Sequence, residues 1–495
     1  MNFTFVPSSR AHAVRATAVV VLMAGAVGFE LATRARTFTE QDSINLANAL
    51  TDFNPAKDQP HPPGYPLIVG AAHLFDWFFT PLGAYLALDL VATLAALAST
   101  YWLARAMFGR TAAIVAAALV WSTPLVLYYG SIVSVYPPEM ALTPLIALLA
   151  FRVATSVDRM SSLLLLPVLA VAGGFRPTLV GLMFPTCALA LVLGRPALRT
   201  VVSGVIMAAA IVCAWAAAIV IGSGGVHPYL QRSRQLYGDA AHGSILHGGT
   251  IGNAAYNVWF TATATVLVAF PAVILVAIFL PRLKLKRPTM IGVQWWILFT
   301  WFASYFLFYA VVLLGKPGYL LAYVPALDVA AAGVVARRLA ARPVAILIAI
   351  AGMLLFVTGH VMPLPSVLAS RHLREYLPTA DSIRTEDRET RGLERFAPSC
   401  LPPSCTIVSL AGSPRFFYHD ADSLRRRYAQ TARVVVWKHV VDGSAPPPHG
   451  RALWIGAEIP AAVADEAKLL AAAGTWHFYA STPKQTALIV QSTLR

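Results

Sequence analysis

The sequence predicts an all-α polytopic membrane domain of about 11 transmembrane helices, followed by a small C-terminal α/β domain. The first observation is composition: 57% of the 495 residues are hydrophobic and only 12% are charged. Soluble domains carry about 25% charged residues. The second observation is the recurrence of long apolar runs, and the third is a rise in charge density near the C-terminus. Together they exclude a disordered chain, a fibrous repeat and an ordinary soluble enzyme.

Charge density places a domain boundary near residue 361. Residues 1–360 hold 22 basic and 11 acidic side chains, whereas the much shorter range 361–495 holds 16 and 12. We therefore expect a transmembrane catalytic domain over 1–360 and an extracytoplasmic α/β domain over 361–495. In the second domain, residue patterns predict a helix over 460–473 and short strands at 406–410, 433–440, 453–459, 476–480 and 487–491.

Apolar runs locate the membrane spans, since a helix needs about 20 apolar residues to cross the hydrocarbon core. The segment 64–79 is also apolar, but His73 and Asp76 interrupt it, so we expect a helix at the membrane surface there. The first run is interpreted as a retained span, because no small-residue cleavage site follows it. The predicted spans lie near 16–33, 81–104, 111–128, 138–153, 161–176, 178–194, 200–221, 257–281, 291–314, 319–336 and 343–360.

The distribution of Lys and Arg predicts the orientation, because cytoplasmic loops are enriched in both. One set of span ends carries 15 basic residues and the opposite set carries 7. The richer set is assigned to the cytoplasm, and the net charge of +15 is read as anchoring charge and not as a nucleic-acid footprint. The external parts are then 34–80, 128–138, the neighbourhood of 176, 222–256, 314–319 and 361–495.

The first external loop combines an acidic helix start with a proline-rich turn. Apolar residues at helical spacing over 46–53 predict a short amphipathic helix lying on the membrane. Asp42 would lie in its first turn, where a capping box with Thr39 and the helix dipole offer an ordinary structural explanation for an acid. The rigid turn His61-Pro-Pro-Gly-Tyr65-Pro follows.

This order of elements resembles the GT-C superfamily of membrane glycosyltransferases, in particular its bacterial protein-mannosyltransferase and aminoarabinose-transferase branch and the related group bearing HPPGYP. In that superfamily an acid of the first external loop is the catalytic carboxylate, so the resemblance implies this role for Asp42. The family order is Asp followed by Glu, whereas this chain reads Glu40-Gln-Asp42-Ser. Glu40 therefore remains the alternative. The resemblance covers residues 1–360 and implies the bacterial inner (cytoplasmic) membrane.

Other external residues match the same resemblance. Ser-Val-Tyr136-Pro-Pro-Glu139 lies where the family often has a second acid beside a tyrosine. Arg176 is a lone arginine at an external helix end, and Lys316, three residues before Tyr319, is a lone lysine. Helix capping could equally explain Glu139, and snorkelling at helix ends could explain the two cations.

The chemistry expected at this face follows from the donor. No nucleotide sugars occur outside the cytoplasmic membrane, so an activated sugar there is carried on a polyprenyl phosphate. Its phosphate leaving group needs cations, and the attacking hydroxyl of a lipid, glycan or protein acceptor needs a base. Arg176, Lys316 and His61 are the candidate phosphate ligands, although His61 could be only a turn residue. The further substrate-site candidates are Glu139, Tyr65, Tyr136 and Tyr319.

Two other functional classes stay open: a secondary transporter and a non-catalytic membrane assembly protein. The acids gather at one face and no internal repeat is visible, which argues against the transporter. No cofactor is assigned beyond a divalent cation as an option. His227, His242 and His247, with Asp239, match no standard zinc spacing. Gly-rich phosphate loops are absent, which argues against a nucleotide site, and no nucleic-acid partner is expected.

Several remaining residues receive structural interpretations. Cys400 and Cys405 bracket four residues on the external side, where disulfides persist, and predict a bridge. Arg232 is interpreted as a solvated loop charge, with contact to an acceptor or a lipid phosphate as the alternative. Asp89 and Asp328 are interpreted as partners in interhelical hydrogen bonds.

Overall fold

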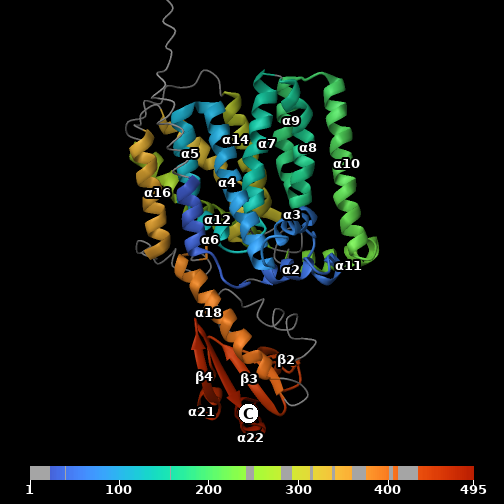
Figure 1. Ribbon diagram of the computed structural model, residues 1–495, viewed down its shortest axis with the longest axis vertical. Coiled ribbons are helices and arrows are strands. Elements are labelled where there is room, and N and C mark those ends of the chain that lie inside the picture. Colours follow the sequence, from blue (N-terminus) through green and yellow to red (C-terminus); the bar gives the residue numbers. More distant parts are fainter. Residues whose placement is uncertain are drawn as a thin grey trace, which may run out of the picture. The chain divides into compact units, whose positions relative to one another are not determined.

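The computed structural model describes residues 23–39, 41–156, 158–240, 250–279, 292–312, 316–336, 341–358, 375–400, 405–410 and 433–494. The chain divides into two compact units, whose elements are labelled in Figure 1. The first unit comprises Met1–Arg34 and Asn48–Thr379, and the second comprises Ala35–Ala47 and Ala380–Arg495. Residues Ala35–Ala47 therefore pack with the C-terminal residues.

The first unit is a bundle of helices, and every apolar run identified in the sequence contains one. After a helix over 23–33, the bundle comprises α3 (Pro66–Asp76), α4 (Pro81–Phe108), α5 (Arg110–Ser122), α6 (Pro124–Ser131), α7 (Tyr136–Ser156), α8 (Arg159–Phe175), α9 (Thr178–Gly194), α10 (Leu198–Gly222), α11 (Val226–Ala240), α12 (Ile251–Val268), α13 (Phe270–Phe279), α14 (Val293–Leu307), α15 (Val324–Val335) and α16 (Ala341–Thr358). Helix α2 (Gln41–Ala49) runs across the boundary between the units.

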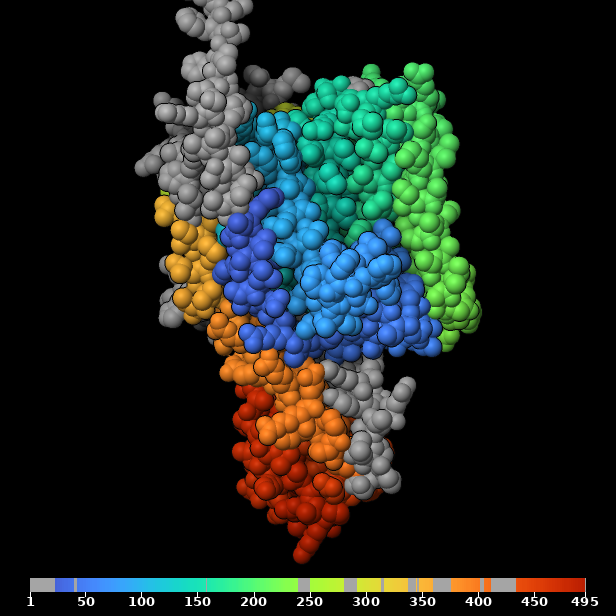
Figure 2. All heavy atoms as spheres, viewed as in Figure 1, coloured from blue at the N-terminus to red at the C-terminus, as the bar shows by residue number. Residues whose placement is uncertain are grey.

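Four helices of the described residues are long and apolar enough to cross a membrane: α4, α7, α10 and the continuous helix Val293–Val312. The number rises to six if the bent pairs α5–α6 and α12–α13 each count as one span. The count of eleven stays a prediction. Helix α10 forms one flank of the bundle, drawn in green in Figure 2, and exposes apolar residues such as Ile206 and Ile221. A helix that is apolar all round and exposed is typical of contact with lipid.

Proline explains the sharpest break in the first half of the bundle. Thr123 is extended, with φ −73° and ψ 119°, because the following Pro124 disfavours the helical region for its predecessor. Helices α5 and α6 consequently meet at 64°. After α6 the chain is held to α4, where Oδ2 of buried Asp89 accepts the Ser134 backbone N–H at 3.0 Å. Asp89 thus bonds to the connection between α6 and α7 and not to a second helix as expected, and it fixes the chain just before α7 begins.

The second unit contains a five-stranded sheet in the order β2-β1-β3-β5-β4. Strand β1 pairs in parallel with β2 and β3, whereas β5 pairs antiparallel with β3 and β4. One apolar cluster, including Ile407 and Phe478, lies against α18, and another, including Trp454 and Ile489, lies against α22. The elements are α18 (Ala380–Phe396), β1 (Cys405–Ser409), β2 (Arg433–Val436), α20 (Trp437–Val441), β3 (Arg451–Gly456), α21 (Ala461–Glu466), β4 (Lys468–Ala473), β5 (Trp476–Ser481) and α22 (Pro483–Leu494).

Three sequence expectations for this unit are wrong. The expected strand 487–491 lies inside α22, which Thr482 caps through a reciprocal pair of bonds with Gln485. The expected strand 433–440 ends at Val436 and continues as α20. The second half of the expected helix 460–473 is β4, because pairing with β5 overrides the helical propensity of a Leu/Ala run. Short apolar runs do not by themselves distinguish helix from strand.

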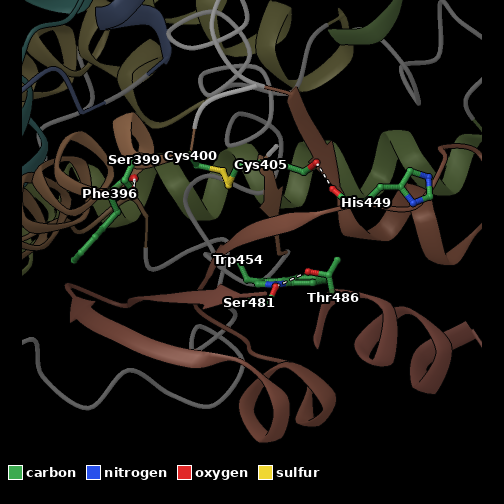
Figure 3. Close-up of a disulfide and its surroundings, with 9 residues drawn as sticks. Phe396, Ser399, Cys400, Cys405, His449, Trp454, Ser481 and Thr486 are labelled. Carbon is green, nitrogen blue, oxygen red and sulfur yellow. Dashed lines mark hydrogen bonds between the residues drawn. A yellow bond between two sulfur atoms is a disulfide. The ribbon is translucent and has the colours of Figure 1, made fainter. Parts of the chain in front are cut away.

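A disulfide joins Cys400 and Cys405 in this unit (Figure 3). Both cysteines are buried beside Leu453 in the cluster under α18. A second link crosses the sheet, where the Trp454 indole N–H donates to the Ser481 hydroxyl at 2.8 Å and Ser481 contacts Thr486 at 2.7 Å (Figure 3). The bridge therefore ties the end of α18 to β1, and the hydroxyl pair ties α22 to the sheet.

Candidate functional site

A buried ion pair joins α7 to the end of α8 in the first unit. The Arg176 guanidinium Nη1 donates to Oε1 of Glu139. Glu139 lies in the first turn of α7, and Arg176 directly follows the last residue of α8. Their side chains are only 2% and 6% exposed. Snorkelling requires an exposed charged group, so it does not explain the buried Arg176. Glu139 is an ion-pair partner as well as an acid in the first turn of its helix.

Tyrosine rings flank this pair. The Arg176 guanidinium carbon lies 4.3 Å from the ring centroid of Tyr319 and 5.7 Å from that of Tyr136. The two rings meet edge to face at 5.7 Å, and Tyr309 stacks on Tyr319 at 5.1 Å. Aromatic faces attract a guanidinium, so the rings hold the cation in place beside Glu139. The predicted residues Glu139, Arg176, Tyr136 and Tyr319 thus come together, whereas Tyr309 was not expected.

Gly318 permits this close arrangement. A Cβ atom at Gly318 would overlap the ring of Tyr136. The chain here forms a 3-10 helix, Pro317–Ala322, whose first bond runs from the Tyr319 N–H to the Lys316 carbonyl at 3.0 Å. Lys316 itself is exposed. The chain around Lys316 therefore places the Tyr319 ring beside the Arg176 guanidinium.

The His-Pro-Pro turn holds a further buried tyrosine, Tyr65. The Tyr65 hydroxyl and His61 Nε2 lie 3.2 Å apart, and their rings meet edge to face at 5.3 Å. Gly64 and Tyr65 both adopt positive φ, at 102° and 45°. That conformation is rare for a tyrosine, and such strain concentrates at functional sites. The Tyr65 side chain is buried, with only 3% of the residue exposed.

An ion pair between distant residues holds this turn in place. Arg232 on α11 donates from Nε and Nη2 to the two carboxylate oxygens of Asp58, each at 2.8 Å. The Tyr229 hydroxyl donates to the Pro63 carbonyl at 3.5 Å. The interpretation of Arg232 as a solvated loop charge is therefore wrong, because α11 folds back onto the first loop. No local signal in the sequence connects residues 174 positions apart.

The remaining candidates lie elsewhere or outside the described residues. Asp42 is partly buried in the first turn of α2 and belongs to the second unit. Glu40 lies outside the described residues, as do His242 and His247, while His227 is exposed on α11. Within the described ranges, no group of three or more His, Cys, Asp or Glu side chains could hold a metal ion.

Comparison with known proteins places the chain by its fold. No protein-family model matches it, and no curated protein matches its sequence. Among solved structures, ArnT from Cupriavidus metallidurans bound to undecaprenyl phosphate matches with a TM-score of 0.55 and 14% identity, over 94% of this chain and 98% of that one. The chain has the fold of ArnT. The apo form of ArnT matches with a TM-score of 0.53 and 16% identity, over 95% and 99%. The fold that the sequence resemblance implied is thereby confirmed.

Proposed function

We propose that the chain is an integral membrane glycosyltransferase that moves a sugar from a polyprenyl-phosphate-linked donor to a hydroxyl acceptor. The carrying observation is the fold shared over nearly the whole length with an ArnT structure that binds undecaprenyl phosphate. The acceptor is a lipid, glycan or protein hydroxyl at the periplasmic face of the bacterial inner membrane. Residues 1–360 form the catalytic domain, and 361–495 form an extracytoplasmic domain. The Cys400–Cys405 disulfide supports that side, because disulfides persist outside the cytoplasm.

Arg176 is the principal ligand of the donor phosphate in this proposal. A guanidinium has five N–H donors in a planar fork, and the bond from Nη1 to Glu139 uses one of them. Glu139 and the flanking tyrosines orient the remaining edge, which suits bidentate phosphate binding. Exposed Lys316 adds a point charge, and His61, whose Nε2 lies 3.2 Å from the Tyr65 hydroxyl, contributes from the turn. The burial of Arg176 strengthens its electrostatic attraction for a phosphate.

Asp42 is the general base. The acceptor hydroxyl oxygen attacks the anomeric carbon, its proton passes to the Asp42 carboxylate, and the bond between the anomeric carbon and the phosphate oxygen breaks. The electron pair of that bond leaves with the polyprenyl phosphate. Arg176 and Lys316 stabilise the charge that develops on the departing phosphate. Atoms and charge balance without a further reactant.

The test combines donor identification with paired variants. A polyprenyl-phosphate sugar should co-purify with the protein and be identified by mass spectrometry. Asp42→Asn keeps the size and helix-capping ability of the side chain, so we expect normal expression and binding of undecaprenyl phosphate, with turnover lowered by about 10²-fold or more. Glu40→Gln is the matched control. A dead Glu40→Gln beside an active Asp42→Asn would move the base to Glu40, and normal turnover in both would refute the mechanism.

A further inference from the structure

In the second unit, hydrogen bonds to Asp387 hold residues 36 and 37, which lie just before the helix that carries Asp42. Asp387, on α18, accepts the Arg36 backbone N–H with both carboxylate oxygens, at 2.9 and 3.0 Å. Its Oδ1 also accepts the Thr37 hydroxyl at 2.8 Å. Asp387 is 7% exposed and Thr37 is 8% exposed, so these charge-assisted bonds are shielded from water. All of these residues, and Asp42, belong to the second unit.

Helix formation does not explain an aspartate at this place. Asp387 lies in the middle of α18, where its side chain can cap neither end and where Asp is a weak helix former. A buried carboxylate is unfavourable unless polar groups satisfy it. Here a backbone N–H and a hydroxyl of the first external loop contribute to that role. The position of Asp387 is therefore explained by its hydrogen bonds to the loop and not by a contribution to the stability of α18.

The captured segment leads directly into α2. Thr37 precedes Asp42 by five positions, and α2 begins at Gln41. Around Asp42 the segment is well packed, since Ser43 is 1% exposed and Leu46 is also 1% exposed. Asp387 therefore holds the chain at Thr37, four positions before α2 begins at Gln41.

We propose that Asp387 is a positioning residue, through which the C-terminal domain holds the Asp42 carboxylate in its reactive place. The inference rests on the proposed function, because it assumes that Asp42 is the base. It gives the C-terminal domain a role in catalysis. A misplacement of about 1 Å in a reacting group can lower a rate by about 10²-fold.

The experiment separates kcat from donor binding in the full-length protein. The probe donor is the undecaprenyl-phosphate-linked sugar, from a panel of pentoses and hexoses, that the unmodified protein consumes. Asp387→Ala should lower kcat by about 10- to 100-fold. The affinity for undecaprenyl phosphate should stay within about twofold of normal, because Arg176 belongs to the other unit. Asp387→Asn keeps one acceptor oxygen and should recover part of the loss.

The matched control is Asp381→Asn on the same helix. Asp381 is 71% exposed and pairs only at 3.7 Å with Arg388, so kcat should not change. Thr37→Val removes one bond and leaves the carboxylate in place, so it decides the matter if Asp387→Ala does not fold. Its kcat should fall by several-fold at normal stability.

Two outcomes keep the proposals distinct. If Asp42→Asn is inactive while folded Asp387→Ala and Thr37→Val both keep normal kcat, the positioning role is refuted and the glycosyltransferase mechanism stands. If Asp42→Asn turns over normally, the proposed function fails first, whatever the Asp387 variants do. Equal losses of donor affinity and kcat in Asp387→Ala would also overturn the inference, because they would indicate general damage to the protein.

Discussion

The buried pair of Glu139 and Arg176 allows a quantitative test of the site. Glu139→Gln keeps the shape of the side chain but removes its charge, and it leaves Arg176 buried without its counter-ion. Removing one member of a buried ion pair destabilises a protein by about 3–5 kcal/mol. The side chains are 2% and 6% exposed, so solvent does not screen the loss substantially. We expect Glu139→Gln to lower the free energy of unfolding by an amount within that range.

The second arm of this test uses ligand and a double variant. Undecaprenyl phosphate should stabilise Glu139→Gln more than it stabilises the unmodified protein, because the lipid phosphate can replace the missing carboxylate beside Arg176. At a ligand concentration of 100 times Kd, binding alone contributes about 2.7 kcal/mol. Combining Glu139→Gln with Arg176→Met should recover most of the stability, since neither charge then remains buried.

The measurement is equilibrium unfolding in detergent micelles, with and without undecaprenyl phosphate. Asp158→Asn is the matched control, because it makes the same carboxylate-to-amide change at the other end of α8. Asp158 caps that helix by accepting the Ser161 N–H at 3.0 Å, and Asn caps about equally well, so little change is expected. A loss below about 1 kcal/mol in Glu139→Gln would refute the view that the pair is a buried, desolvated contact.

Two further predictions concern the surroundings of the site. Asp58→Asn and Arg232→Gln should each lower the free energy of unfolding by about 1.5–3 kcal/mol, and the double variant should lower it by little more than either single change. The control Arg234→Gln, on the exposed face of α11, should leave the free energy of unfolding unchanged. Additive losses in the double variant would show that Asp58 and Arg232 do not interact. Gly318→Ala should destabilise by about 1–3 kcal/mol and weaken binding of undecaprenyl phosphate, because its Cβ displaces a tyrosine ring beside Arg176. Gly181→Ala, where nothing lies within 4 Å of the added methyl, should be neutral or stabilising, and equal losses at both glycines would contradict this reasoning.

Local patterns were sufficient for the helical architecture. Long apolar runs predict helices because a chain in hydrocarbon must satisfy its own backbone hydrogen bonds. The His61-Pro-Pro turn and the start of α2 at Gln41, beside Asp42, could also be predicted, because proline and an acidic first turn act on the backbone within a few residues. Strands β1, β3 and β5 were also found, because each has a clear apolar core face.

The secondary-structure predictions that were wrong concern segments whose conformation depends on residues distant in the sequence. The Leu/Ala run of β4 becomes a strand only because β5 offers a partner, and the apolar run inside α22 becomes helical because Ile489 packs under the sheet. For such short runs, pairing and burial outweigh intrinsic propensity, which amounts to less than about 1 kcal/mol per residue.

By itself, the sequence determined a predominantly helical, apolar chain with a small α/β domain and indicated a resemblance to GT-C enzymes, and it identified most of the candidate site residues one at a time. Only the tertiary structure decided which of them are partners. Glu139 and Arg176 each had an ordinary local explanation until burial made them one ion pair, and Arg232 joined Asp58 across 174 positions. The anchoring of residues 36 and 37 by Asp387 was equally invisible. Periodicity encodes contacts along one element, whereas the pairing of buried charges depends on which distant elements the packed core brings together.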